Sequence, residues 1–188
     1  MAGWVENGFF SIYESMEYTP VGGTASMPVI DGIAATVGRN RVTVLGHSLG
    51  GALAAYLTLD LALATPQFAG TLRAVMFASP HPGDSAFARF FDANVADYMV
   101  YNYSRDTAPH VPAVIPFLVN YAALPLTFVF QPQDADAVIQ NTPGGNHHAI
   151  CYAAMLDYQA ADWTNMPAVD KECAACIEGP NFPNPAII

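Results

Sequence analysis

The sequence predicts an α/β fold in which helices cover both faces of a mostly parallel sheet. The first observation is that short apolar, β-branched segments alternate with segments of helical spacing between residues 3 and 103, as is typical of parallel sheets. The second is a strand, a Gly-His-Ser-Leu-Gly turn and a helix that follow one another between residues 42 and 64. At 188 residues the chain can bury one substantial core, so we expect a single domain over residues 1–188.

Apolar spacing places the elements along the first half of the chain. Apolar residues that recur every three or four positions predict helices, and short runs of apolar and β-branched residues predict strands. Prolines and glycines mark the breaks between them. The expected elements are helices over residues 3–16, 27–37, 49–64 and 85–93, and strands over residues 42–45, 72–78 and 98–103.

Prolines interrupt the second half of the chain. Apolar residues between 111 and 126 are separated by three prolines, which disfavours one continuous helix. This segment is either the irregular wall of a hydrophobic pocket or ordinary core. A strand over residues 127–130, a polar loop over 131–145 and a helix over 149–158 are expected next, and the proline-rich residues from 167 on are expected to wrap the surface.

The Gly-His-Ser-Leu-Gly turn carries the residue to which we assign the chemistry. Between a strand and a helix, a Gly-x-Ser-x-Gly turn is a nucleophile elbow, in which the serine hydroxyl projects above the sheet from a strained bend. Ser48 is therefore the predicted nucleophile. We expect Gly46 and Gly50 to be required because a β-carbon at either position would collide with the packed strand and helix. Because the helix N-terminus faces the serine, the backbone N–H of Leu49 is a candidate donor to an oxyanion.

A serine hydroxyl becomes a good nucleophile only when a base takes its proton and a third group orients that base. In hydrolases built on such a sheet, the order along the chain is serine, acid, histidine. Asp106 follows a strand end and is the orienting acid that we favour. Asp84 also follows a strand end, but Pro82-Gly83-Asp84 looks like a turn leading into a helix cap.

Five histidines are candidates for the base. His47 occupies the variable position of the elbow and is expected to point away from the catalytic face and to pack. His81 and His110 lie in proline-rich loops, where pocket lining or loop structure is a better interpretation than proton transfer. His147 and His148 lie late in the chain, close before a helix, and the residues alone leave the choice between them open.

Composition narrows the function classes. Sixteen acidic against six basic residues give a net charge of −10, which argues against nucleic-acid binding and against electrostatic attachment to anionic lipid. Hydrophobic residues make up 53% of the chain, a surplus that suits a neutral or apolar substrate. No apolar run reaches the roughly 18 residues of a membrane span, and the first residues lack the pattern of a signal peptide, so the cellular location stays open.

The cysteines give no sign of a metal site. Cys151, Cys173 and Cys176 are an odd number, so they cannot all pair within the chain. The last two lie three positions apart but lack the second pair that a four-cysteine zinc site needs. We expect no catalytic role for any of them, and neither a metal nor an organic cofactor is implied.

Taken together, these motifs resemble a known family. The stretch over residues 46–54, Gly-His-Ser-Leu-Gly-Gly-Ala-Leu-Ala, is similar to the signature of the class 3 lipases, fungal-type triacylglycerol lipases of the α/β-hydrolase fold. The similarity runs from about residue 3 to residue 158. The other segments that carry it are Gly8-Phe9 with Tyr13, Phe77-Ala78-Ser79-Pro80 with Gly83-Asp84 and Phe87, Asn102 with Asp106, Pro109 and Pro112, and His147 with Tyr152.

The resemblance implies a serine carboxylester hydrolase, a lipase or esterase that cleaves acylglycerols or other fatty esters through an acyl-enzyme on Ser48. It makes His147 the base, with His148 as the fallback, and it keeps Asp106 as the acid. A thioesterase, amidase or feruloyl-type esterase would use the same three residues. The other alternative is a lipase-like scaffold, catalytically weak or silent, that binds a ligand or a protein.

The chain also departs from the family pattern. The family's strand with a basic residue, a glycine and a serine or threonine, which supplies the second oxyanion donor, would lie upstream of this sequence. We therefore expect an N-terminally truncated domain that self-associates through an open sheet edge. Glu6 stands where the family often has a histidine. The family's mobile lid is missing or reduced to residues 18–27.

Overall fold

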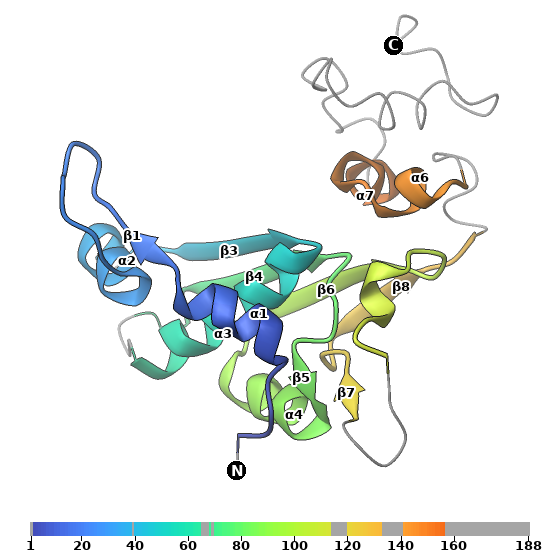
Figure 1. Ribbon diagram of the computed structural model, residues 1–188, viewed down its shortest axis with the longest axis horizontal. Coiled ribbons are helices and arrows are strands. Elements are labelled where there is room, and N and C mark those ends of the chain that lie inside the picture. The colour runs from blue at the N-terminus through green and yellow to red at the C-terminus, as the bar shows by residue number, and fades with distance from the viewer. Residues whose placement is uncertain are drawn as a thin grey trace, which may run out of the picture.

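The structure, a computed structural model, describes residues 2–38, 40–64, 68, 70–113, 120–132 and 141–156. Figure 1 shows how its helices and strands are arranged. In chain order these elements are α1 (Asn7–Glu14), β1 (Glu17–Tyr18), β2 (Met27–Pro28), α2 (Val29–Val37), β3 (Val42–His47), α3 (Leu49–Ala64), β4 (Leu72–Phe77), β5 (Gly83–Asp84), α4 (Ser85–Asn94), β6 (Tyr98–Tyr103), the 3-10 helix η2 (Ala108–His110), β7 (Tyr121–Ala122), β8 (Thr127–Phe130), α6 (Pro143–His147) and α7 (Ala149–Leu156).

A four-stranded sheet in the order β3-β4-β6-β8 forms the centre of the fold, and its neighbouring strands are all parallel. This arrangement confirms the predicted α/β class with a mostly parallel sheet. Two small antiparallel pairs, β1 with β2 and β5 with β7, lie outside the central sheet. Because the central strands are parallel, their carboxyl ends meet at one edge, where sites of such sheets form.

The helix α3 packs against β3 and β4 on one face of the central sheet, and α1 and α4 pack against α3 on the same side (Figure 1). Alternate residues of each strand point to this face, among them the buried Val44 of β3 and Met76 of β4. Eight residues of α3 are buried, so this helix is covered on most of its circumference, which explains why its Ala/Leu-rich sequence has no broad polar stripe. Phe87 and Phe91 of α4 are also buried in this core, as the sequence predicts.

The helices α6 and α7 lie on the opposite side of the sheet, near the carboxyl ends of β6 and β8 (Figure 1). A second core cluster joins them to the sheet: Tyr103 and Phe130 of the strands pack with Cys151 and Tyr152 of α7. Within the described part of the chain this face is less completely covered elsewhere, since the side chain of Leu45 in β3 is 67% exposed. Helices therefore lie on both faces, as predicted, but unequally.

The structure differs from the prediction near the N-terminus. β1 and β2 form a short hairpin, so Met27 belongs to a strand and the helix expected from this residue begins at Val29. The first helix is also shorter than expected and begins at Asn7. It begins there because the carboxylate of Glu6 accepts a hydrogen bond of 2.6 Å from the backbone N–H of Phe9 and caps the helix.

A second difference lies late in the chain. The stretch over residues 131–145 is predicted to be a loop, yet α6 begins within it at Pro143 and ends at His147. The hydroxyl of Thr142 accepts a hydrogen bond of 2.9 Å from the backbone N–H of Gly145, and proline is well suited to the first helical position, so this sequence can start a short helix.

Some predictions fall outside the described part of the chain. They include the middle of the suspected pocket wall, residues 114–119, and everything from residue 157 on, with Cys173 and Cys176. The single domain over residues 1–188 therefore stays a prediction. Among the described residues, no helix combines the length and the apolar character needed to cross a membrane.

Candidate active site

Ser48 lies on a sharp bend between β3 and α3. Its φ angle is +59°, in the left-handed region, which costs a residue with a β-carbon roughly 1–2 kcal/mol. Backbone hydrogen bonds on both sides fix this bend: the N–H of Ser48 donates to the carbonyl oxygen of Phe77 at 3.0 Å, and the N–H of Gly51 donates to the carbonyl oxygen of Ser48 at 2.8 Å. The backbone therefore has the strained strand-to-helix geometry that the sequence predicts.

The glycines of the bend have different roles from those expected. A β-carbon at Gly46 would lie 2.1 Å from the carbonyl oxygen of Gly50, so this glycine is required. The same test at Gly50 meets no atom within 4 Å, so the predicted collision there is wrong. The second close approach is at Gly51, where a β-carbon would lie 2.8 Å from the side chain of Ser79. The helix thus packs closely against the loop after β4 at Gly51, a contact that was not predicted.

Asp106 follows β6 and is almost fully buried, with 1% of its surface exposed. Its Oδ1 accepts a hydrogen bond of 2.9 Å from the backbone N–H of Ala108, in the same loop. Its Oδ2 accepts a hydrogen bond of 2.7 Å from the hydroxyl of Tyr152 in α7. A buried carboxylate needs such donors to remain charged, and here both oxygens are used.

His147, the last residue of α6, lies between Asp106 and Ser48. Its Nδ1 is 3.1 Å from Oδ1 and 3.0 Å from Oδ2 of Asp106, and its Nε2 is 2.9 Å from Oγ of Ser48. Because an ionised carboxylate only accepts hydrogen bonds, Nδ1 carries the proton in the neutral ring. This tautomer leaves Nε2 free to accept the hydrogen of the serine hydroxyl. The structure thus brings together the three side chains that the sequence selects, and it is the ring of His147 that reaches the serine.

Tyr152 is a member of this site that the residue-by-residue reasoning missed. Its hydroxyl donates to Asp106 and also accepts a hydrogen bond of 2.9 Å from the backbone N–H of Tyr103. Burial, and then the charge of Asp106, raise the pKa of the Tyr152 hydroxyl far above its ordinary value, so it stays a donor. In the sequence, Tyr152 could be noticed only through the family motif that pairs it with His147. That motif does not indicate which groups the tyrosine contacts.

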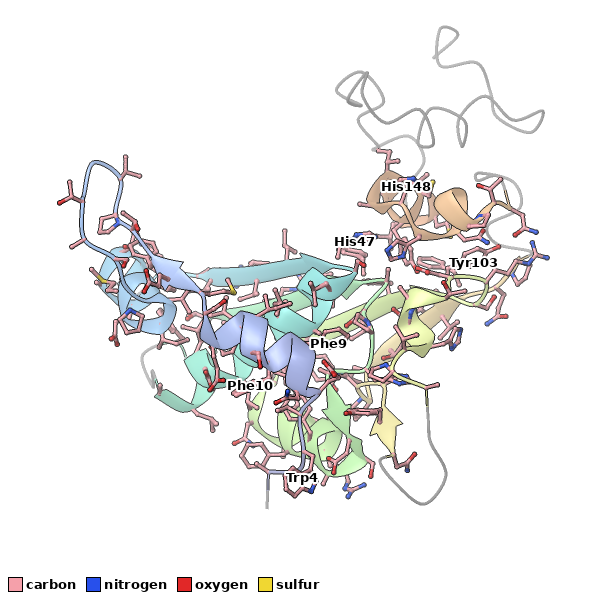
Figure 2. All side chains as sticks on the ribbon, viewed as in Figure 1. Trp4, Phe9, Phe10, His47, Tyr103 and His148 are labelled. Carbon is pink, nitrogen blue, oxygen red and sulfur yellow. The ribbon has the colours of Figure 1, made fainter. Side chains whose placement is uncertain are left out.

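The predicted direction of the His47 side chain is wrong, although its ring does pack against neighbouring rings. Its side chain does not point away from the site: Nε2 lies 2.6 Å from the carbonyl oxygen of His147, and the two imidazole rings have centroids 4.9 Å apart. Figure 2 shows His47 at the end of β3, on the side where α6 and α7 lie. Side chains alternate along a strand, so His47 points to the face opposite the one on which Val44 is buried, and that face carries the base.

The other candidates are engaged elsewhere. The Oδ1 of Asp84 accepts hydrogen bonds from the backbone N–H groups of the first turn of α4, at 2.8 and 3.0 Å, which confirms the predicted helix cap. Nδ1 of His81 lies 3.1 Å from the carbonyl oxygen of Pro112, a loop contact, and burial lowers the pKa of this imidazole. His110 is exposed in η2. It is Nε2 of His147, and not one of these side chains, that forms the hydrogen bond with Ser48 Oγ.

Leu49 is the first residue of α3, directly after Ser48. Its backbone N–H is therefore at the helix N-terminus, where an anion is stabilised. Its role as an oxyanion donor stays a prediction. In the ranges that the structure describes, no group of three histidine, cysteine or acidic side chains is arranged to bind a metal ion.

This geometry can be compared with known families. A family model for class 3 lipases matches residues 1–115. The chain belongs to the class 3 lipase family. The match includes Ser48 and Asp106, whereas His147 lies beyond it. The position of His147 beside Ser48 is therefore given by the structure and not by the family match.

Several individual lipases are similar to this member of the class 3 lipase family. A secreted mono- and diacylglycerol lipase of Malassezia globosa is 39% identical over 75 residues, which are 39% of this chain and 24% of that protein. A lipase of Caenorhabditis elegans is 32% identical over 113 residues, 58% of this chain and 30% of that protein. The solved structure of lipase II from Rhizopus niveus has a TM-score of 0.47 at 30% identity, covering 58% of this chain and 39% of that chain. The chain thus spans less than a third of the length of these curated relatives.

Proposed function

We propose that this chain is a serine carboxylester hydrolase of the lipase or esterase type, with Ser48 as nucleophile, His147 as general base and Asp106 as orienting acid. The observation that carries the proposal is the continuous chain of hydrogen bonds from Ser48 Oγ to His147 Nε2, at 2.9 Å, and from His147 Nδ1 to Asp106, at 3.0 and 3.1 Å. Such a chain activates a serine because the imidazole accepts its proton and the carboxylate stabilises the imidazolium that results.

The proposed reaction has two halves. First, Oγ of Ser48 attacks the ester carbonyl carbon while its proton passes to Nε2 of His147, and the backbone N–H of Leu49 stabilises the oxyanion. The tetrahedral intermediate collapses, the alcohol leaves with the proton from His147, and the acyl group remains on Ser48. Then a water molecule gives its proton to His147 and attacks the acyl carbon, so that the carboxylic acid is released and Ser48 recovers its hydrogen.

We propose fatty esters, and acylglycerols in particular, as the substrate class. The names of the relatives support this proposal, since one of them is a mono- and diacylglycerol lipase. The composition supports it as well, because a chain with 53% hydrophobic residues and a net charge of −10 suits an uncharged, apolar substrate. A panel of p-nitrophenyl esters of increasing acyl length, together with mono- and diacylglycerols, would establish the preferred substrate.

A fluorophosphonate probe tests the mechanism directly, because it phosphonylates only an activated serine. We expect labelling of the full chain at Ser48 and none of Ser48→Ala, with circular dichroism as the check that both are folded. Ester hydrolysis should disappear in the same variant. A folded wild-type chain that takes up no probe would contradict the proposal and would favour the lipase-like binding scaffold instead.

A further inference from the structure

His47 makes a contact that the proposed mechanism does not use. It directly precedes Ser48 in the chain, and its Nε2 lies 2.6 Å from the main-chain carbonyl oxygen of His147. A carbonyl oxygen can only accept a hydrogen bond, so Nε2 of His47 must carry a proton and donate it. The residue next to the nucleophile is therefore bonded to the backbone of the residue that carries the base.

The surroundings of His47 favour this donor form. Its ring packs 4.9 Å from the ring of His147 and, edge on, 6.0 Å from the ring of Tyr152, and it is partly buried. Burial is the largest influence on the pKa of this imidazole and lowers it; the hydrogen bond to the carbonyl oxygen of His147 and the charge of Asp106 act in the opposite direction, and the neighbouring His147 and His148 rings lower the pKa further. Near neutral pH the ring is uncharged and has one proton, and the carbonyl oxygen selects Nε2 for it.

We propose that His47 is a positioning residue for His147, acting through this hydrogen bond; the inference rests on the proposed function of the site. Asp106 holds the imidazole of His147 at Nδ1, and the side chain of Asn146 links α6 to the carbonyl oxygen of Arg105 in the loop after β6, but neither contact is made by the main chain of His147. The bond from His47 fixes the main chain of the same residue to the last position of β3. Ring and backbone of the base are thus held from two different elements.

The physical reason for such an arrangement is the long separation between nucleophile and base. Ser48 and His147 are 99 residues apart in the chain, and their hydrogen bond depends on how α6 sits relative to β3. Because His47 and Ser48 share a peptide bond, a donor on His47 ties the position of the base to that of the nucleophile itself. A misplacement of about 1 Å between reacting groups can cost about 100-fold in rate, so a contact at this point matters for catalysis.

The first test detects the hydrogen bond of His47 directly and does not depend on enzymatic activity. In the full chain labelled with 15N, a two-bond 1H–15N correlation spectrum near pH 7.5 distinguishes which ring nitrogen carries the proton, and single substitutions assign the five histidines. We expect His47 as the Nε2–H tautomer and His147 as the Nδ1–H tautomer. A spectrum in which the proton of His47 resides on Nδ1, wholly or in part, would overturn the inference.

The second test reads the consequence for the base. His47→Met keeps a side chain of similar length but has no donor, whereas His47→Gln keeps an N–H at similar reach. We expect the rate of phosphonate labelling at Ser48 to fall about 10-fold or more in His47→Met and to stay within about threefold of the wild type in His47→Gln. His81→Met is the matched control, because His81 also contacts a backbone carbonyl, in a loop outside the triad, and we expect wild-type labelling there.

The outcomes separate this inference from the proposed function. If the wild type is labelled but His47→Met reacts at the wild-type rate, or if His47→Met and His47→Gln are slowed equally, His47 does not position the base through its N–H. If the folded wild type is not labelled at all, the hydrolase proposal fails. The tautomer of His47 then decides alone whether this residue holds the backbone of His147.

Discussion

The left-handed backbone at Ser48 leads to a stability prediction that two substitutions at one position can test. Ser48→Gly and Ser48→Ala both remove the hydroxyl and its 2.9 Å hydrogen bond to His147, so this loss cancels when the two variants are compared. What remains is the φ angle of +59°, which glycine adopts freely and which alanine adopts only at a cost. The difference between the variants therefore measures the strain of the bend.

The size of the difference follows from two opposing effects. The left-handed conformation costs a residue with a β-carbon roughly 1–2 kcal/mol. Glycine loses more backbone entropy on folding than alanine, which returns roughly 0.5–1 kcal/mol in favour of alanine. We expect Ser48→Gly to be the more stable variant by about 1 kcal/mol, which is about 2–4 °C in melting temperature for a chain of this size.

Urea unfolding followed by circular dichroism is the appropriate assay, with both variants fitted to a common slope so that the difference lies in the midpoint. Neither variant should react with the fluorophosphonate, because both lack the hydroxyl of Ser48. The comparison therefore measures stability alone, at equal loss of reactivity. A Ser48→Ala variant as stable as Ser48→Gly, or more stable, would refute the view that the bend is strained.

Three further predictions follow from other contacts. Tyr152→Phe removes the donor to Asp106 and leaves the buried N–H of Tyr103 without its acceptor, so the free energy of unfolding in urea should fall by about 2–3 kcal/mol. A decrease well below about 1 kcal/mol would contradict the importance of this hydroxyl for stability. Because burial lowers the pKa of the His81 imidazole, unfolding takes up a proton at acid pH, and the free energy of unfolding of the wild type should fall as the pH drops below about 6.5. His81→Gln should lose less stability than the wild type between about pH 7.5 and 5.5, and equal losses would argue against this linkage. β3 is an edge strand of the described sheet and Leu45 on it is 67% exposed, so we predict self-association that Leu45→Lys weakens at least tenfold in sedimentation velocity, whereas a wild type that sediments as a monomer at micromolar concentration would count against it.

The elements around the nucleophile could be predicted from the sequence because local pattern and packing agree there. Strands such as β4 and β6 are short apolar runs between clear breaks, and α3 has the composition of a buried helix. The two-residue strands β1, β2, β5 and β7 were not predicted, since they have no periodicity and form only when a partner segment lies alongside. The five-residue helix α6 is likewise too short for apolar spacing to reveal it.

The three side chains that the structure brings together were easier to predict than their supporting contacts. Ser48, Asp106 and the pair of late histidines could be selected because each has a residue type that acyl transfer requires, at the end of an expected strand or beside a helix. The contact of His47 with the backbone of His147 depends on where α6 sits over the sheet, which no local pattern encodes. The same is true of the close approach of α3 to the loop after β4, which lies at Gly51 and not at Gly50.

The carboxylate of Asp106 accepts hydrogen bonds from three parts of the chain: the backbone N–H of Ala108 in its own loop, the ring of His147 in α6 and the hydroxyl of Tyr152 in α7. Because both carboxylate oxygens are hydrogen-bonded, the side chain of Asp106 cannot rotate when the imidazole of His147 gains or loses a charge. The imidazole it faces would therefore keep one orientation while an alcohol departs and while water arrives, so that a single resting geometry could serve both halves of a catalytic cycle.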